Sequence, residues 1–500
     1  MRRPDAEPDT RNRRAPRVLI VATVTLAWFI AFEAGTRLAA RLGWVNLPST
    51  AIEGFDETYA GRDAPVEQRL FQEDPMLLFA MRPHFRRMYS KVAVSEGDER
   101  YYEVLTEGHG FRTPSFGAHK TSGVFRIVCL GDSSTFGMNV GASDTYPRLL
   151  AARLEADFPG AFEVINLGVP GYTSRQGLEL LRRTALTYEP DLVTFAFGTN
   201  DRFAPRPFED DALMRFGQTW TGTFLFYARQ WLDGLYVYRL AQHSVPEGRL
   251  PGTNALGKRV SLEGIRDNIL AARDLLAARG SALVVLNTDF FVTDARESLR
   301  AGANQAQVAF VDLPAVLNAE RGEHTRTLAA ERNLAPATPA PGEMLFRVVA
   351  PGRSDVGLKL LRWLQAPEMI PMHDDGTSGD QVAGDGIWSV LVPAQPGERF
   401  KYSYWSDLRA TPVKDVLDGY PGGDTLRQVF HDGGQPPIDL FGHPSLMSDP
   451  THPNEDGQRV IAKHLEEAVL AEPTVRAFLA GAASKPRPAG PPLTPEAAAS

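Results

Sequence analysis

The stretch VFRIVCLGDSSTFG, residues 124–137, decides the fold. Its first half is a short apolar run that predicts a buried strand, and its second half is a polar turn between two glycines. The segment YPRLLAARLEADF (146–158) then repeats apolar residues at helical spacing, with Asp144 as a candidate N-cap. A strand, a tight turn and a helix in this order are typical of the start of a βαβ unit.

The same alternation continues along the chain. Four more short apolar runs predict strands, over 163–167, 191–197, 281–287 and 308–313. Helical spacing predicts further helices over 174–186 and 262–278, the second of them capped by Ser261. Strands this apolar suit a parallel sheet that is covered by helices on both faces. We therefore expect an α/β fold with three layers.

The α/β pattern breaks after residue 324. Residues 325–343 are rich in alanine and proline and predict a linker. Over 344–430, short alternating segments lie between Gly, Asp and Pro turns, which predicts antiparallel strands and an inserted β-sandwich. Helical spacing returns over 457–470, and the Pro/Ala-rich residues 481–500 predict a disordered tail.

The N-terminus has the layout of a membrane anchor. Residues 1–17 hold six arginines and three acidic residues, a net charge of +3, so the rest of a chain of net charge −8 carries −11. The uncharged run VLIVATVTLAWFIAF (18–32) follows, and it approaches spanning length when extended to Thr36. By the positive-inside rule the N-terminus stays in the cytoplasm and the body is exported. A cleaved signal peptide and a buried core helix are the alternatives.

The composition excludes several classes of protein. A chain of 500 residues with 43% hydrophobic and 23% charged residues is neither disordered, nor collagen-like, nor a multi-span membrane protein. One cysteine, Cys129, excludes a disulfide framework and a cysteine-based zinc site. The mild net charge argues against nucleic acid as the main partner.

Polar segments follow the predicted strands at their carboxyl ends, where open α/β sheets bind ligands. Three follow the first three strands and one lies near the C-terminus: 131–137 (GDSSTFG), 166–171 (NLGVPG), 198–201 (GTND) and 449–454 (DPTHPN). A serine at a glycine-flanked turn becomes a nucleophile once a histidine removes its proton. An acid three residues before that histidine can orient it, and N–H donors can hold the oxyanion of the intermediate.

These four blocks, in this order, resemble the SGNH (GDSL-like) hydrolase family. Ser133 matches the serine of block I, Gly171 the glycine of block II and Asn200 the asparagine of block III. Asp449 and His452 match the D-x-x-H of block V. The resemblance implies a flavodoxin-like sheet and catalysis by a Ser-His-Asp triad of Ser133, His452 and Asp449. It also implies an oxyanion hole formed by Ser133, Gly171 and Asn200.

The resemblance covers the segments 121–335 and 433–475. Ser134 departs from the family, since many members have a hydrophobic residue there, and it is interpreted as a structural turn residue. Gly168 is a second candidate for block II, although the spacing to the Thr-Ser pair at 173–174 favours Gly171. The sequence predicts neither a cofactor nor a metal for the site. The segment 131–137 lacks the glycine spacing of P-loops and dinucleotide sites, and none of the nine histidines other than His452 has a partner pattern.

Two further segments carry chemistry-bearing residues. Residues 372–390 resemble a turn motif of immunoglobulin-like or starch-binding-like modules. Asp375, Asp380 and Asp385 in it are candidate calcium ligands, but the absence of EF-hand spacing favours hydrogen-bonded Asp-Gly turns. The segment 203–238 holds ten aromatic residues, which suit a lid, an acyl- or sugar-binding wall, or local helix packing.

The whole pattern predicts an exported, membrane-tethered serine ester hydrolase that removes acetyl or other acyl groups from a carbohydrate. A polysaccharide O-acyltransferase, a lipid esterase or thioesterase, and a glycan-binding scaffold with a vestigial site are the alternatives. The predicted partners are the ester substrate and, through the N-terminal helix, the membrane, with the catalytic domain on its periplasmic or extracellular side. The predicted divisions are a cytoplasmic leader 1–17, an anchor 18–36, a stem 37–120, a hydrolase domain 121–335 and 433–480, an inserted module 344–430 and a tail 481–500.

Overall fold

A computed structural model gives the fold of most of the chain. The residues that it describes are 14–45, 70–91, 101–117, 119–203, 209–244, 258–290, 294–332, 334, 339–362, 368–396, 398–406, 413–414, 427–430, 436, 438–441, 446–448 and 451–483. They belong to two compact units: Met1–Phe79 with Ala212–Ala255, and Ala80–Asp211 with Leu256–Ser500.

Five parallel strands form the central sheet of the second unit. In chain order they are β5 (Phe125–Gly131), β6 (Phe162–Gly168), β7 (Leu192–Phe197), β8 (Ala282–Asn287) and β9 (Ala309–Asp312). Their order in the sheet is β6-β5-β7-β8-β9, and every neighbouring pair is parallel. This 2-1-3-4-5 order matches that of flavodoxin, where the ligand binds beside the switch between the first and third strands. The predicted parallel α/β sheet is confirmed.

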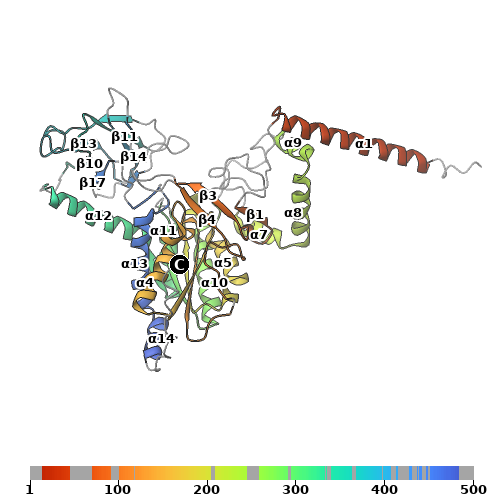
Figure 1. Cartoon of the computed structure of the whole chain (residues 1–500), viewed down its shortest axis with the longest axis horizontal. Coiled ribbons are helices and arrows are strands. Elements are labelled where there is room, and N and C mark those ends of the chain that lie inside the picture. The colour runs from red at the N-terminus through yellow and green to blue at the C-terminus, as the bar shows by residue number, and fades with distance from the viewer. Residues whose placement is uncertain are drawn as a thin grey trace, which may run out of the picture. The chain divides into compact units, whose positions relative to one another are not determined.

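Helices cover both faces of this sheet. The longer ones are α4 (Tyr146–Asp157), α5 (Ser174–Arg183), α10 (Leu262–Ala277), α11 (Ala295–Ala306), α12 (Leu313–Glu331), α13 (Glu455–Ala471) and α14 (Pro473–Ala483). Apolar side chains of α4, α12 and α13 share one buried cluster with the strands. In Figure 1, α4 and α13 lie on one side of the strands and α5 and α10 on the other. Two short helices begin at strand ends, α3 (Ser133–Phe136) after β5 and α6 (Thr199–Phe203) after β7.

Local sequence signals explain most of these boundaries, with two corrections. Ser261 caps α10 as predicted, since its Oγ accepts the Gly264 N–H at 3.1 Å. Thr145 rather than Asp144 is the N-cap of α4, because a short 3-10 turn ends at Asp144. The helix α12 runs into the predicted linker 325–343, because its alanine, leucine and glutamate favour a helix and the prolines begin later.

The predicted irregular stem, 37–120, contains regular structure instead. The helix α1 (Arg14–Arg41) continues into it, and four strands pair as β1 (Phe71–Asp74) with β2 (Leu78–Met81) and β3 (Arg86–Ser90) with β4 (Tyr101–Leu105). Arg112, which lies within the second unit, contacts the chain that follows β5. Its guanidinium is buried and donates to the carbonyls of Gly137 at 2.6 Å and Val140 at 2.8 Å, just after α3. Arg112 thereby supports the turn at the end of β5.

Two small sheets lie between α12 and α13 in the sequence. The strands of the first are β10 (Glu343–Val349), β13 (Ile387–Pro393) and β17 (Ile438–Leu440); those of the second are β11 (Val356–Arg362), β12 (Glu368–Pro371), β14 (Arg399–Ser406), β15 (Val413–Lys414) and β16 (Arg427–Phe430). One buried apolar cluster takes side chains from both sheets, including Phe346, Leu358 and Tyr402. The hydroxyls of Tyr402 and Tyr404 both donate to Asp439 Oδ2. These two tyrosines are therefore core residues.

The first unit contains α1 and the helices α7 (Asp210–Gly217), α8 (Trp220–Asp233) and α9 (Tyr236–Ser244), of which α7 begins in the second unit. Within the described residues, one segment, Ile20–Arg41, is long and apolar enough to cross a membrane. Only 11% of its apolar window is buried, so the alternative of a buried core helix does not fit. A signal sequence or a membrane anchor is consistent with this helix.

Candidate active site

Ser133 lies at the carboxyl end of β5, as the first residue of α3. Asp132 caps this helix, since its Oδ1 accepts the Ser134 N–H at 2.9 Å. Gly131 leaves no space for a side chain, because a Cβ there would stand 1.9 Å from Thr135 Oγ1. The glycine-flanked sequence thus forms a tight turn that places Ser133 at the edge of the sheet. The first N–H groups of the helix have no carbonyl within reach in the helix itself.

His452 reaches Ser133 from the loop before α13. The Ser448 N–H donates to the His452 carbonyl at 2.8 Å, and Asn454 caps α13 at its first turn, so both ends of the loop are held. His452 Nε2 lies 2.8 Å from Ser133 Oγ. Both residues are buried, with 7% of His452 and 8% of Ser133 exposed. A serine hydroxyl within hydrogen-bonding distance of an imidazole nitrogen is the arrangement that general-base activation requires.

Asp449, the predicted orienting acid, lies outside the described residues. Among the described residues, Thr451 contacts the other nitrogen of the imidazole, with its Oγ1 3.1 Å from His452 Nδ1. A neutral imidazole that accepts the Ser133 proton on Nε2 carries its own proton on Nδ1. The Thr451 hydroxyl can accept that N–H and so favours the tautomer that general-base action needs. Thr451 is not among the site residues predicted from the sequence.

Gly171 and Asn200 lie next to each other beyond the ends of β6 and β7. Gly171 has a φ of 81°, in the left-handed region that favours glycine. Asn200 Nδ2 donates to the carbonyl of Tyr172, the residue after Gly171, at 3.1 Å. Gly168, the other candidate for this position, packs against α3, since a Cβ there would stand 2.2 Å from the Phe136 nitrogen. Close packing against α3 therefore accounts for the glycine at position 168, and Gly171 remains the candidate oxyanion donor.

A buried ion pair that the sequence analysis missed holds the Gly171 loop. Arg259 Nη2 lies 2.8 Å from Asp210 Oδ2, and at most 3% of either side chain is exposed. Arg259 also donates to the Gly171 carbonyl at 2.7 Å and to Gln176 Oε1 at 2.7 Å. The two charged residues stand 49 positions apart, so no local pattern could have paired them. We infer that this pair positions Gly171.

Replacing Arg259 by methionine should lower kcat by about 10- to 100-fold, because the Gly171 loop loses its anchor and small displacements are costly in active sites. Loss of the buried positive charge beside Asp210 should also lower the free energy of unfolding by about 3–5 kcal/mol. Kinetics on an activated acetyl ester and urea unfolding measure the two effects. The double variant Arg259→Met/Asp210→Leu should recover stability but not kcat. Full recovery of kcat in the double variant would contradict the positioning role.

Asp132, the residue before Ser133, connects the carboxyl ends of β5 and β8. Its Oδ2 accepts the Thr288 hydroxyl at 2.7 Å, from the end of β8, while its Oδ1 caps α3. Complete burial raises the pKa of Asp132 to about 6, against the opposing effects of the Ser134 and Thr288 hydrogen bonds and the nearby His452. Above that pH the buried carboxylate favours a positive charge on His452. An imidazole that accepts the serine proton in general-base catalysis acquires this positive charge.

Asp201 forms a second buried carboxylate in the block that follows β7. It accepts the backbone N–H of Ser174 at 3.1 Å and the Ser174 hydroxyl, at the start of α5. Burial raises the pKa of Asp201 from 3.8 to about 7, although the Ser174 hydrogen bonds oppose the shift. Asp201 thus links α5 to α6. The described hydrogen bonds of its carboxylate go to Ser174, and not to Ser133 or His452.

Asp201 should make stability fall as the pH rises from about 4 to about 7. The unfolded chain releases this proton near pH 3.8, while the folded chain holds it up to about 7, so the folded state binds more protons in between. In Asp201→Asn this contribution is absent. The free energy of unfolding of the variant minus that of the wild type should therefore grow across this window and then level off. Urea unfolding at successive pH values tests this, and a difference independent of pH would refute it.

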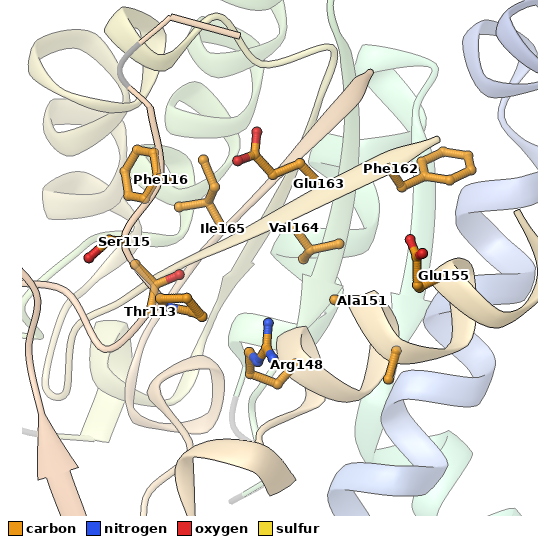
Figure 2. Close-up of a pocket in the computed structure, with 12 residues that line it drawn as sticks. Thr113, Ser115, Phe116, Arg148, Ala151, Glu155, Phe162, Glu163, Val164 and Ile165 are labelled. Carbon is orange, nitrogen blue, oxygen red and sulfur yellow. The ribbon is translucent and has the colours of Figure 1, made fainter. Parts of the chain in front are cut away.

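A cleft of about 360 Å³ lies elsewhere, along the edge strand β6. Figure 2 shows Arg148 and Glu155 on α4 facing the first half of β6, with Thr113 and Phe116 on the neighbouring loop. None of the predicted site residues that the structure describes lines this cleft. It is therefore separate from the candidate active site, which lies beyond the opposite, carboxyl end of the sheet.

The acidic cluster of the predicted insert differs from the sequence prediction in one member. Carboxylate oxygens of Asp374, Asp380 and Asp385 lie within 4.8 Å of one another, whereas the prediction named Asp375. Backbone N–H groups already donate to two of these side chains: Asp385 and Gly386 to Asp374, and Gly376 to Asp380. The structure therefore favours the interpretation of hydrogen-bonded Asp-Gly turns.

Comparison with known proteins identifies the middle of the chain. A model of the GDSL-like Lipase/Acylhydrolase family matches residues 129–334. Among proteins with curated descriptions, none matches this sequence. Similar solved structures include a lipase/acylhydrolase from Enterococcus faecalis (16% identity, 39% of this chain and 80% of that one, TM-score 0.25). They also include an acetyl xylan esterase from Geobacillus stearothermophilus (15%, 40% and 80%, 0.25) and the esterase EstA from Pseudoalteromonas sp. (14%, 37% and 76%, 0.22).

Proposed function

Because residues 129–334 form a GDSL-like lipase/acylhydrolase domain and the chain is a carboxylic ester hydrolase, we propose that Ser133 is its nucleophile. The observation that carries this assignment is the distance of 2.8 Å between Ser133 Oγ and His452 Nε2. His452 is the general base, and Asp449 is the acid that orients it. The burial of both partners supports the role, since a dry site strengthens each electrostatic interaction in it.

The proposed reaction has two halves. Ser133 Oγ attacks the acyl carbon while His452 Nε2 takes the hydroxyl proton, and the tetrahedral intermediate collapses as His452 gives that proton to the leaving alcohol. Water then attacks the acyl-serine with His452 again as base, which releases the carboxylic acid and restores Ser133.

Three N–H groups are proposed to bind the oxyanion of these intermediates. The Ser133 N–H opens the first turn of α3, and the Gly171 N–H lies in a loop whose carbonyl is fixed by Arg259. Asn200 uses one of its two amide hydrogens on the Tyr172 carbonyl, which leaves the second for the oxyanion. Donors held in place before the reaction stabilise the developing charge without reorganisation.

The substrate class we propose is a carbohydrate that carries acetyl or other acyl groups, on the exported side of a membrane. Two observations support it: the six arginines before the apolar run favour export of the body, and the two small sheets are additional to the parallel sheet. The division into leader, anchor, stem, split hydrolase domain, inserted sandwich-like module and tail belongs to the same proposal.

The full chain in detergent micelles, given an acetylated oligosaccharide with isotopically heavy acetyl groups, tests this function. We expect heavy acetate in solution, released faster than from an acetylated lipid of equal concentration. A second, unacetylated oligosaccharide in the same mixture serves as an acceptor. Heavy acetyl groups appearing on the acceptor faster than in solution would show an acyltransferase, and preference for the lipid would show a lipid esterase.

A further inference from the structure

The helix α8 carries an aromatic stripe that is exposed to solvent. Its members are Trp220, Phe224, Tyr227 and Trp231, spaced by four, three and four residues, which places them on one face of the helix. They are exposed to 81%, 57%, 56% and 72%. Four large aromatic side chains on one open face do not suit local helix packing, which was one of the sequence-based interpretations. This face therefore needs a partner.

The next helix, α9, is fastened to α1 within the first unit. Glu33 of α1 accepts the N–H groups of Tyr236 and Val237, the first residues of α9, at 3.0 and 2.9 Å. Arg37 pairs with Glu33 at 2.6 Å and donates to the carbonyl of Gly234, the residue that follows α8, at 2.8 Å. The end of α8 is therefore held at the level of Glu33 and Arg37.

That level is where the apolar part of α1 ends. The uncharged run of α1 extends from Val18 to Phe32, and Glu33 and Arg37 are the first charged residues after it. In a helix that crosses a bilayer, the first charges after the apolar run mark the membrane–water interface on that side. The end of α8, with Trp231 three residues before Gly234, thus lies at the interface. Tryptophan and tyrosine are enriched at this depth in membrane proteins.

The direction of α8 agrees with this placement. Figure 1 shows α8 running across the direction of α1 and not along it. A helix that starts from the interface and runs across a membrane-crossing helix lies in the plane of the bilayer. With one aromatic face, it has the layout of an interfacial amphipathic helix, which buries that face at the boundary of headgroups and acyl chains.

We propose that α8 binds the surface of the same bilayer that α1 crosses, on the side of the exported body, with Trp220, Phe224, Tyr227 and Trp231 inserted among the lipids. This inference rests on the membrane-tethered function proposed above, and it adds a second point of attachment. A single helix would leave the body free to turn on its tether. Two attachments joined through Glu33 and Arg37 hold the first unit in one orientation on the membrane.

Site-specific labelling of the full chain in lipid vesicles tests the proposal. The single native cysteine, Cys129, is buried, so one introduced cysteine can carry an environment-sensitive fluorophore. The variants are Phe224→Cys in the stripe, Arg229→Cys on the opposite face of α8, and Val24→Cys within the apolar run of α1. Nitroxide-labelled phosphatidylcholine in phosphatidylethanolamine/phosphatidylglycerol vesicles quenches a fluorophore that contacts lipid.

Quenching should be about threefold or more stronger at 224 than at 229, because an interfacial helix inserts only one face into the lipid. Quenching at 24 but equally weak quenching at 224 and 229 would overturn the proposal and leave the anchor intact. Quenching at none of the three positions would overturn the anchor as well. Shielding at 224 that depends on protein concentration and not on lipid would show a second copy as the occupant. The same labels in Ser133→Ala should behave identically, which separates this inference from the enzymatic one.

Discussion

Replacing Ser133 by alanine should reduce kcat on an activated acetyl ester by about 10⁴- to 10⁶-fold. The physical reason is that no acyl-enzyme can form once Oγ is gone, whatever the rest of the site still binds. The oxyanion donors remain, so a residual rate above that of water is expected. Stopped or continuous assays of p-nitrophenyl acetate hydrolysis by the full chain in micelles measure the loss.

Ser134→Ala is the matched control for this experiment. Ser134 is the neighbouring residue and is also buried. Its N–H donates to Asp132, its carbonyl accepts from Gln458 at 3.3 Å, and its hydroxyl also hydrogen-bonds to Asp132. Alanine keeps the two backbone contacts, and Asp132 still accepts the Ser134 N–H and the Thr288 hydroxyl when the Ser134 hydroxyl is removed, so kcat should change by no more than a few-fold. A large loss in Ser134→Ala with normal turnover in Ser133→Ala would exchange the roles of the two serines and refute the assignment.

Replacing His452 by alanine should cost about as much as replacing Ser133, roughly 10⁴- to 10⁶-fold in kcat, because the two act as one unit. For the same reason the double variant should be no worse than either single variant. The pH dependence is a second readout, since the variant should lose the rise in kcat/KM that accompanies deprotonation of the base. Steady-state kinetics across pH 5 to 9 would give both quantities.

His464→Ala serves as the control for the histidine. His464 lies on α13, twelve residues after His452, with its Nδ1 3.3 Å from Glu467 Oε2. Its loss should leave kcat unchanged within a few-fold. Additive losses in the Ser133→Ala/His452→Ala double variant would show that the two side chains act separately, and the proposed general-base role of His452 would then be wrong.

The sequence was informative where the determinants were local. The run 124–130 and its glycine-flanked turn predicted a strand and a tight connection, and β5 and α3 lie there. Short apolar runs predicted the other four strands to within two residues at each end, because buried parallel strands leave an almost continuous apolar signal. Ser261 was identifiable as a cap from its place before a helical repeat.

Contacts between segments that are far apart in the sequence could not be predicted from local patterns. Asp210 is the first residue of α7 and Arg259 follows α9 in the sequence, and nothing near either residue indicates that they meet beside Gly171. Arg112 lies in a segment that was expected to be irregular, yet its guanidinium supports the turn after Ser133. Buried charges of this kind are set by the three-dimensional packing and not by periodicity.

Two predictions that were based on residue types alone differ from the structure. Alanine next to proline suggested a linker over 325–343, although alanine is the strongest helix former and α12 continues until Glu331. In the acidic turns of the predicted insert, Asp374 and not Asp375 joins Asp380 and Asp385, because the backbone N–H groups of Asp385 and Gly386 draw Asp374 inward. The local geometry of such turns depends on hydrogen bonds that the residue types alone do not specify.

The most direct measurement of the central assignment is covalent trapping of the nucleophile. The full chain is treated with a fluorophosphonate, which phosphonylates activated serines, and the modified residue is located by peptide fragmentation that separates Ser133 from Ser134. The account predicts one adduct, on Ser133, that forms far more slowly in His452→Ala and is absent in Ser133→Ala. An adduct on any other residue that accompanies loss of esterase activity would contradict it.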